Sequence, residues 1–147
     1  MKLGLNLSFA VKRWLEAERL AALVADDLDT RYAQFTWDLV DPWWPEAQRD
    51  QLALAYTRAF ARAGVTIESS FGGLASYSYN HILGPTPELR ELGRQHLARA
   101  IDMTAAMEVS VAGMPFGSFG ADDAVDPRRR EELYKTALDI YVGLSRH

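Results

Sequence analysis

The amino-acid sequence predicts an α/β protein that forms a (β/α)4 half of a TIM barrel, with parallel strands and helices on one face. Two observations support this prediction. Four strand–helix units follow one another about every 37 residues along the 147-residue chain, and each strand alternates apolar with polar side chains. A complete barrel needs eight units and roughly 250 residues. We therefore expect residues 1–147 to form a single, apparently truncated half-barrel domain with open sheet edges.

The first two units span the first 64 residues. Alternating leucines predict a strand over residues 2–7, and apolar residues at helical spacing predict a helix from about Arg13. The second strand is expected over residues 32–37. Pro45 is a favourable first residue of the next helix, because its missing N–H has no intrahelical partner there. Gly64 is expected to end that helix in a left-handed conformation.

The last two units have longer connections. A strand is expected over residues 65–70, then a loop to Pro85 and a helix that Thr86 caps. The predicted buried stripe of this helix consists of Leu89, Leu92, Leu97, Ile101 and Ala105. A fourth strand is expected over residues 108–112. A glycine-rich loop, residues 113–125, then leads to a helix that begins at Asp126.

The strands place polar residues on the face opposite the apolar one. This set comprises Asn6, Gln34, Thr36, Thr66, Glu68, Ser70, Glu108 and Ser110. If the helices cover the apolar face, the polar set points into the barrel interior. Burying such groups without partners costs about 1–3 kcal/mol each. We therefore expect them to pair with one another, with water or with a hydrophilic ligand.

The candidate site lies at the loops that follow the strands, because (β/α) barrels build their active sites there. His81, in a loop, and Glu68, near the end of its strand, are the candidates for ligand contact there, and the loop aromatics are Trp37, Trp43, Trp44, Phe71, Tyr77 and Phe116. Packing is favoured over sugar stacking for Trp43 and Trp44. His96 lies within a helix, where packing or surface exposure is expected. No catalytic residue is identified.

Composition excludes several classes of function. The chain has no cysteine, which excludes disulfides and thiolate chemistry. Its net charge is −4, without the basic stripe of a nucleic-acid surface. No apolar stretch is long enough for a membrane span, and no signal-peptide pattern is present, so a cytoplasmic protein is expected. The three histidines, at positions 81, 96 and 147, lack metal-ligand spacing, and no metal site is predicted.

Three segments together resemble the sugar phosphate isomerase/epimerase family, the xylose isomerase-like TIM barrels. They are the opening strand over residues 2–6, the Trp-rich loop over 37–45 and the Tyr77-x-Tyr79-Asn80-His81-x-x-x-Pro85 segment. Within the family, the likeness is to tetrulose-phosphate isomerases, and it covers the N-terminal half only.

The resemblance implies a divalent metal and two acid/base glutamates in the full-length family. These come from strands five to eight, so no cofactor is expected from this chain alone. It also implies that Asn6, Asp38, Glu68 and His81 face the substrate.

The leading hypothesis is the N-terminal half of a metal-dependent enzyme of carbohydrate metabolism that interconverts ketose and aldose phosphates. This half would contribute substrate-facing loops, be inactive alone and pair as a homodimer through its sheet edges. The alternative is a non-catalytic sugar-binding or interaction module. A third hypothesis, an endonuclease acting at abasic DNA, is disfavoured by the acidic charge balance. Neither nucleic acid nor membrane is expected as a partner.

Overall fold

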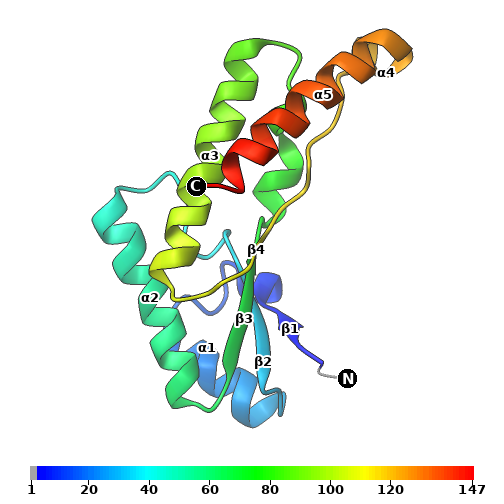
Figure 1. Ribbon diagram of the computed structural model, residues 1–147. Coiled ribbons are helices and arrows are strands. Elements are labelled where there is room, and N and C mark those ends of the chain that lie inside the picture. Colours follow the sequence, from blue (N-terminus) through cyan, green and yellow to red (C-terminus); the bar gives the residue numbers. More distant parts are fainter. Residues whose placement is uncertain (1–2) are drawn as a thin grey trace.

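The computed structural model describes residues 3–147, which form a parallel sheet with helices packed against it (Figure 1). The sheet order is β1-β2-β3-β4, and every neighbouring pair is parallel. The strands are β1 (Leu5–Asn6), β2 (Tyr32–Thr36), β3 (Thr66–Phe71) and β4 (Ala112–Gly113). The predicted α/β fold with four parallel strands is confirmed.

The helices alternate with these strands. The described α-helices are α1 (Ala17–Ala22), α2 (Glu46–Arg62), α3 (Pro87–Ala106), α4 (Ala121–Val125) and α5 (Pro127–Leu144). Shorter helical turns are η1 (Leu7–Ala10), η2 (Leu23–Asp27), η3 (Leu74–Ser78) and η4 (His81–Leu83). Thr86 caps α3 by accepting a hydrogen bond from the backbone N–H of Leu89, and Asp126 caps α5 in the same way. Both predicted helix starts are confirmed.

The core lies between the sheet and the helices. Helices α1, α2 and α3 lie on one side of the sheet, and α5 packs against α3 and η4 (Figure 1). Fully buried residues in this layer include Leu20, Val24, Phe35, Phe60, Leu97, Met103 and Leu133. No helix within residues 3–147 combines the length and the apolar character that a bilayer span requires.

The other face of the sheet carries a row of paired polar side chains. The Asn6 amide donates to Oε1 of Gln34 at 2.7 Å, and the Gln34 amide donates to Oγ of Ser69 at 3.0 Å. The row crosses β1, β2 and β3 in turn. The prediction that the polar residues of this face pair with one another is confirmed for Asn6 and Gln34.

A β-bulge in β3 changes which of its serines belongs to that row. Ala33 of β2 faces Ile67, whereas the next residue, Gln34, faces Ser69, so that Glu68 is the additional residue. Strict alternation placed Ser69 on the apolar face. That expectation was wrong, because the bulge shifts the alternation by one position.

The same shift turns Ser70 towards the helices. Its hydroxyl accepts a hydrogen bond from Nε1 of Trp37 at 3.1 Å and lies 2.6 Å from the hydroxyl of Thr104 on α3. Ser70 is completely buried, so its predicted place on the open polar face was also wrong. Thr36, assigned to that polar set as well, is buried at the end of β2.

Two connections differ from the predicted boundaries. Strand β4 begins at Ala112, and Glu108, the expected first strand residue, lies exposed in the turn after α3 with φ of 60°. Its N–H bonds to the carbonyl oxygen of Ala105, which closes the turn. The first helix begins at Ala17 instead of Arg13, because η1 and a short connection follow β1.

Candidate functional site

A cavity of about 810 Å³ opens where β1, β2 and β3 end. Residues from segments 11–12, 37–44 and 73–81, which follow these strands, form most of its lining. Helix α3 closes the remaining side with residues between positions 89 and 96. The cavity therefore lies at the carboxyl edge of the sheet, where the sequence places the site.

His81 is buried at this cavity in an unusual backbone conformation. Its φ is 49°, in the left-handed region that a residue with a Cβ seldom adopts. Its Nε2 bonds to the carbonyl oxygen of Ser76. Because a carbonyl only accepts, Nε2 carries the hydrogen and Nδ1 is the ring atom left for another partner. Such strain at a buried polar residue is typical of functional positions.

Two glycines permit this position of His81. A Cβ on Gly93 of α3 would lie 2.6 Å from the His81 carbonyl carbon. A Cβ on Gly117, whose φ is 115°, would overlap the carbonyl oxygen of Asn80. The Asn80 amide also donates to the Ser118 carbonyl at 2.7 Å. The segment after β4 thus packs against Asn80, the residue before His81, and holds Asn80 in place.

His96 on α3 lines the same cavity and stacks on His81. The two ring centroids are 5.7 Å apart at an interplanar angle of 25°. Nδ1 of His96 is buried without a hydrogen-bond partner. Burial lowers the pKa of His96, the neighbouring His81 lowers it further, and Asp41 partly opposes the change. We therefore expect His96 to be neutral at pH 7.

Sequence reasoning missed His96 because a helix position was expected to serve packing or to face solvent. The cavity residues of α3 are Leu89, Leu92, Gly93 and His96. They recur at the i, i+3, i+4, i+7 spacing of a single helix face, which is the signal that could have identified them. Leu89 and Leu92, predicted to be buried in the core, are about half exposed and lie at the cavity.

Asp38 joins the loops that follow β2 and β3. Its Oδ2 accepts a hydrogen bond from the backbone N–H of Leu74 at 2.6 Å. A Cβ on Gly73 would overlap the Asp38 carboxylate, so a larger residue there would displace the carboxylate from this position. Asp38 and His81, both predicted site residues, line one cavity.

Asn6 and Glu68, the other two predicted site residues, lie elsewhere. Asn6 belongs to the polar row on the open face of the sheet, where it bonds to Gln34 and accepts from the N–H of Ser8. Glu68 is exposed at the β3 bulge. Neither side chain lines the cavity within residues 3–147. The structure therefore divides the predicted set between the cavity and the open polar face.

The predicted aromatic residues divide in a similar way. Trp37, Trp43 and Trp44 line the cavity, together with Tyr79. Trp37 is buried, whereas Trp43 and Trp44 are about half exposed. The remaining three, Phe71, Tyr77 and Phe116, are not among the lining residues. Phe116 instead packs against two tyrosines of α5, tilted against Tyr134 and stacked on Tyr141, at centroid distances of 5.6 and 5.7 Å.

Described residues 3–147 contain no group of three or more His, Asp or Glu side chains able to hold a metal ion. Asp38 lines the cavity and Glu68 does not, so these two carboxylates are not brought together there. The residues present therefore do not fit the divalent metal that the family resemblance implies. No metal-dependent step is derived for this chain.

Comparison with known proteins links the chain to sugar epimerases and isomerases. No protein-family model matches it. Over all 147 residues it is 30% identical to D-erythrulose 1-phosphate 3-epimerase of Brucella abortus (strain 2308), of which it covers 47%. It superimposes on the crystal structure of a candidate xylose isomerase from Rhodospirillum rubrum ATCC 11170 with a TM-score of 0.96 and 65% identity, over 98% of this chain and 49% of that one. The chain corresponds to the N-terminal half of a xylose isomerase-like TIM barrel.

A third relative extends the structural likeness of this half-barrel. D-psicose 3-epimerase from Clostridium cellulolyticum H10, solved with D-tagatose, matches with a TM-score of 0.69 at 12% identity, over 99% of this chain and 48% of that one. At that identity the match shows the fold alone. The half-barrel spans about half the length of each relative. The family resemblance predicted from the three sequence segments is confirmed.

Proposed function

We propose that the chain forms the substrate-binding half of a sugar or sugar phosphate isomerase/epimerase that interconverts ketose and aldose phosphates. The observation that supports it is the cavity at the carboxyl edge of the sheet, where aromatic walls surround the strained, buried His81. The relative named D-erythrulose 1-phosphate 3-epimerase supports sugar phosphate epimerisation within this class, and ketose–aldose interconversion is proposed from the sequence resemblance.

The cavity combines the two kinds of contact that a sugar requires. The indole faces of Trp43 and Trp44 offer flat apolar surfaces for the C–H side of a sugar ring or chain. Asp38 and His81 offer a carboxylate and an imidazole to sugar hydroxyl groups. Asn6 and Glu68 lie on the open face of the sheet, which is the interior face in a closed barrel, and we propose that they meet the substrate from there.

Metal dependence of the reaction is also a proposal and rests on the family. The acid/base glutamates and the metal ligands that the resemblance implies come from strands outside this chain. We propose that the 147-residue protein binds sugars but does not turn them over. Turnover assays with and without added Mg²⁺ or Mn²⁺ test this, and robust metal-dependent turnover would contradict it.

Calorimetric titration of the 147-residue protein tests the binding role. D-erythrulose 1-phosphate and D-tagatose are suitable probes, because the names of the relatives include them. We expect at least one of them to bind, and His81→Ala to weaken that binding about three- to tenfold through a lost hydrogen bond. His147→Ala, on an exposed histidine, is the control and should bind as the unmodified protein does. If neither probe binds at millimolar concentration, the proposal is wrong.

A second candidate function is a non-catalytic sugar-binding or interaction module. It is favoured by the fact that residues between positions 11 and 96 of this chain form a cavity of about 810 Å³. A module of this kind would bind sugars with the same affinity whether or not the other half of a barrel is supplied. If a separately produced second half restores turnover, the module hypothesis is wrong.

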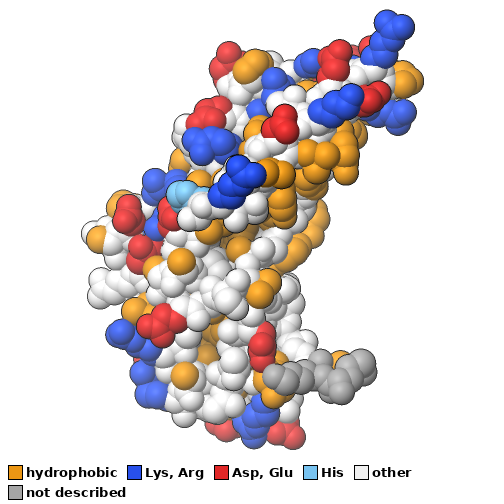
Figure 2. Space-filling model, viewed as in Figure 1, with side chains coloured by type: hydrophobic (Ala, Val, Ile, Leu, Met, Phe, Trp, Pro, Cys, Tyr) orange, Lys and Arg blue, Asp and Glu red, His pale blue; other side chains and the backbone are white. Residues whose placement is uncertain are grey.

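We also propose that two copies pair as a homodimer through their sheet edges. Within the described residues, β1 pairs only with β2 and β4 only with β3. Hydrophobic side chains gather along α5 and the segment leading to it (Figure 2), with Tyr134 and Val142 about half exposed. The native mass in solution tests the pairing, and a strict monomer would contradict it. A cytoplasmic location stays a prediction from the sequence.

A further inference from the structure

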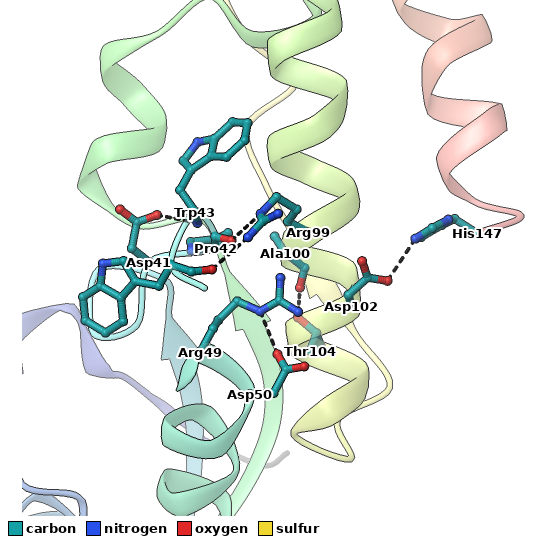
Figure 3. A network of polar contacts seen from close by, with 11 residues as sticks. Asp41, Pro42, Trp43, Arg49, Asp50, Arg99, Ala100, Asp102, Thr104 and His147 are labelled. Atoms are coloured by element: carbon teal, nitrogen blue, oxygen red, sulfur yellow. Dashed lines mark hydrogen bonds and ion pairs between the residues drawn. The ribbon is translucent and has the colours of Figure 1, made fainter. Parts of the chain in front are cut away.

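Arg99 of α3 reaches across to the loop between β2 and α2 and holds it at two points (Figure 3). Its Nε donates to the carbonyl oxygen of Pro42 at 2.8 Å, and one terminal nitrogen donates to the carbonyl oxygen of Trp44, also at 2.8 Å. Both contacts have the geometry of strong charge-assisted hydrogen bonds. The two carbonyls flank Trp43 along the chain, so Arg99 fixes the backbone on either side of that residue.

The Arg99 guanidinium also contacts the Trp43 ring directly. Its central carbon lies 5.6 Å from the ring centroid, which is within the range of a cation–π interaction. Within residues 3–147, Arg99 makes no ion pair with a carboxylate. Its charge is therefore directed at two carbonyl dipoles and one aromatic ring, all in the same loop.

Trp43 in turn contacts the histidine pair. Its ring centroid is 5.9 Å from that of His96 at 33°, and His96 stacks on His81. Asp41 shapes the same turn, because its Oδ1 accepts from the Trp43 N–H and its carbonyl oxygen accepts from the Trp44 N–H. A line of contacts thus runs from Arg99 through Trp43 and His96 to His81, along one side of the cavity.

We propose that Arg99 is a positioning residue that holds the Trp43 indole as a wall of the sugar-binding cavity. The effect of Arg99 on sugar binding rests on the proposed function, whereas the restraint of the Trp43 loop by Arg99 does not. Trp43 is 45% exposed, although Leu39 and Val40 of the same loop are buried. Packing therefore anchors the start of the loop and leaves about half of the Trp43 surface in solvent, where Arg99 makes the contacts that hold it. A lysine cannot replace the arginine fully, because a single ammonium group lacks the planar fork that reaches two carbonyls while facing a ring.

The experiment compares Arg99→Gln and Arg99→Lys with Arg94→Lys as a matched control. Arg94 lies on the same helix, and its exposed side chain pairs with Glu91 without lining the cavity. Amide hydrogen exchange at Trp43 and Trp44 reports the loop without any ligand. Calorimetry with D-erythrulose 1-phosphate and D-tagatose reports binding, and thermal unfolding checks that each variant folds.

We expect exchange at both amides to rise about tenfold in Arg99→Gln and about threefold in Arg99→Lys, with no change in the control. A tenfold rise corresponds to about 1.4 kcal/mol, which is close to the lower value for a single hydrogen bond to a charged group. Binding should weaken in the same order. Arg99→Lys keeps the charge and the methylene packing, and it serves if Arg99→Gln does not fold.

Unchanged exchange at Trp43 and Trp44 in both Arg99 variants would overturn the inference, whatever the binding data show. Faster exchange together with unaltered binding would overturn the assignment of Trp43 as a wall of the site. If the unmodified protein binds neither probe but exchange rises as expected, the restraint of the Trp43 loop by Arg99 stands and the proposed function fails. The two failures are therefore distinguishable.

Discussion

Gly93→Ala tests whether close backbone contact with α3 holds His81 in the cavity. The added Cβ would lie 2.6 Å from the carbonyl carbon of His81 and 2.9 Å from its Cα. Non-bonded carbon atoms rest at about 3.5–4.0 Å. Because both of these atoms belong to the backbone, no side-chain rotation relieves the overlap. Either α3 or the η4 turn must move, and His81 moves with it.

The expected magnitude follows from two opposing terms. Alanine is favoured over glycine inside a helix by roughly 0.5–1 kcal/mol. Overpacking a filled site costs about 1–3 kcal/mol, so Gly93→Ala should lower the free energy of unfolding by up to about 2.5 kcal/mol. Gly143 of α5 is the matched control, because its added Cβ meets nothing within 4 Å. At that position only the helix preference for alanine over glycine acts, so Gly143→Ala should raise the free energy of unfolding by up to about 1 kcal/mol.

Urea denaturation of the two variants measures the difference, which should be about 1–3 kcal/mol, and sugar titration measures the effect on the cavity. Gly93→Ala should weaken binding because His81 is displaced, whereas Gly143→Ala should leave binding unchanged. If Gly93→Ala stabilises the protein as much as Gly143→Ala does, the contact between α3 and His81 is not tight, and the reasoning about its placement fails.

Three further perturbations test the core and the histidine pair. Thr104→Val removes the buried hydroxyl partner of Ser70 and should cost about 1–3 kcal/mol of unfolding free energy in urea; a loss below about 0.5 kcal/mol would contradict the network. Leu133→Ala, at a fully buried position of α5, should cost about 2–5 kcal/mol, and a negligible loss would show that α5 is not part of the core. Burial holds the pKa of His96 below its ordinary 6.5. As the pH falls through 6.5, the unfolded chain therefore takes up a proton at this position before the folded protein does. The free energy of unfolding declines from that pH down to the pKa of His96 in the folded protein. His96→Gln should make this decline shallower, whereas His147→Gln should leave it as it is. If the free energy of unfolding of His96→Gln depends on pH as that of the unmodified protein does, His96 is not the group that causes the decline.

The behaviour of β3 shows how far periodicity carries a prediction. Alternation located the strand to within one residue at each end, because a two-residue period is a property of extended backbone itself. It could not locate the bulge at Glu68, since the extra residue is set by how β3 pairs with β2. The serine assigned to each face was therefore reversed beyond that point, and buried Ser70 was missed as the partner of Trp37.

The candidate site shows the same division. The loops after the strands were identifiable because a parallel sheet brings the carboxyl ends of its strands to one edge, and Asp38 and His81 do meet there. His96 was not identified, because whether a helix residue faces the core or a cavity depends on the element packed opposite. The separation of Asn6 and Glu68 from the cavity was equally invisible, since it depends on how the strands pair and on the bulge at Glu68.

By itself, the sequence determined the α/β class, the number and order of the units and the likeness to half of a xylose isomerase-like barrel. These follow from local periodicity, helix caps and turn residues, which act over a few neighbouring positions. Only the tertiary structure decided which side chains share the cavity, which glycines hold His81 in place and how Arg99 reaches Trp43. Such contacts join residues from about a dozen to more than fifty positions apart, and they are set by packing between elements and not by the preferences of any one segment.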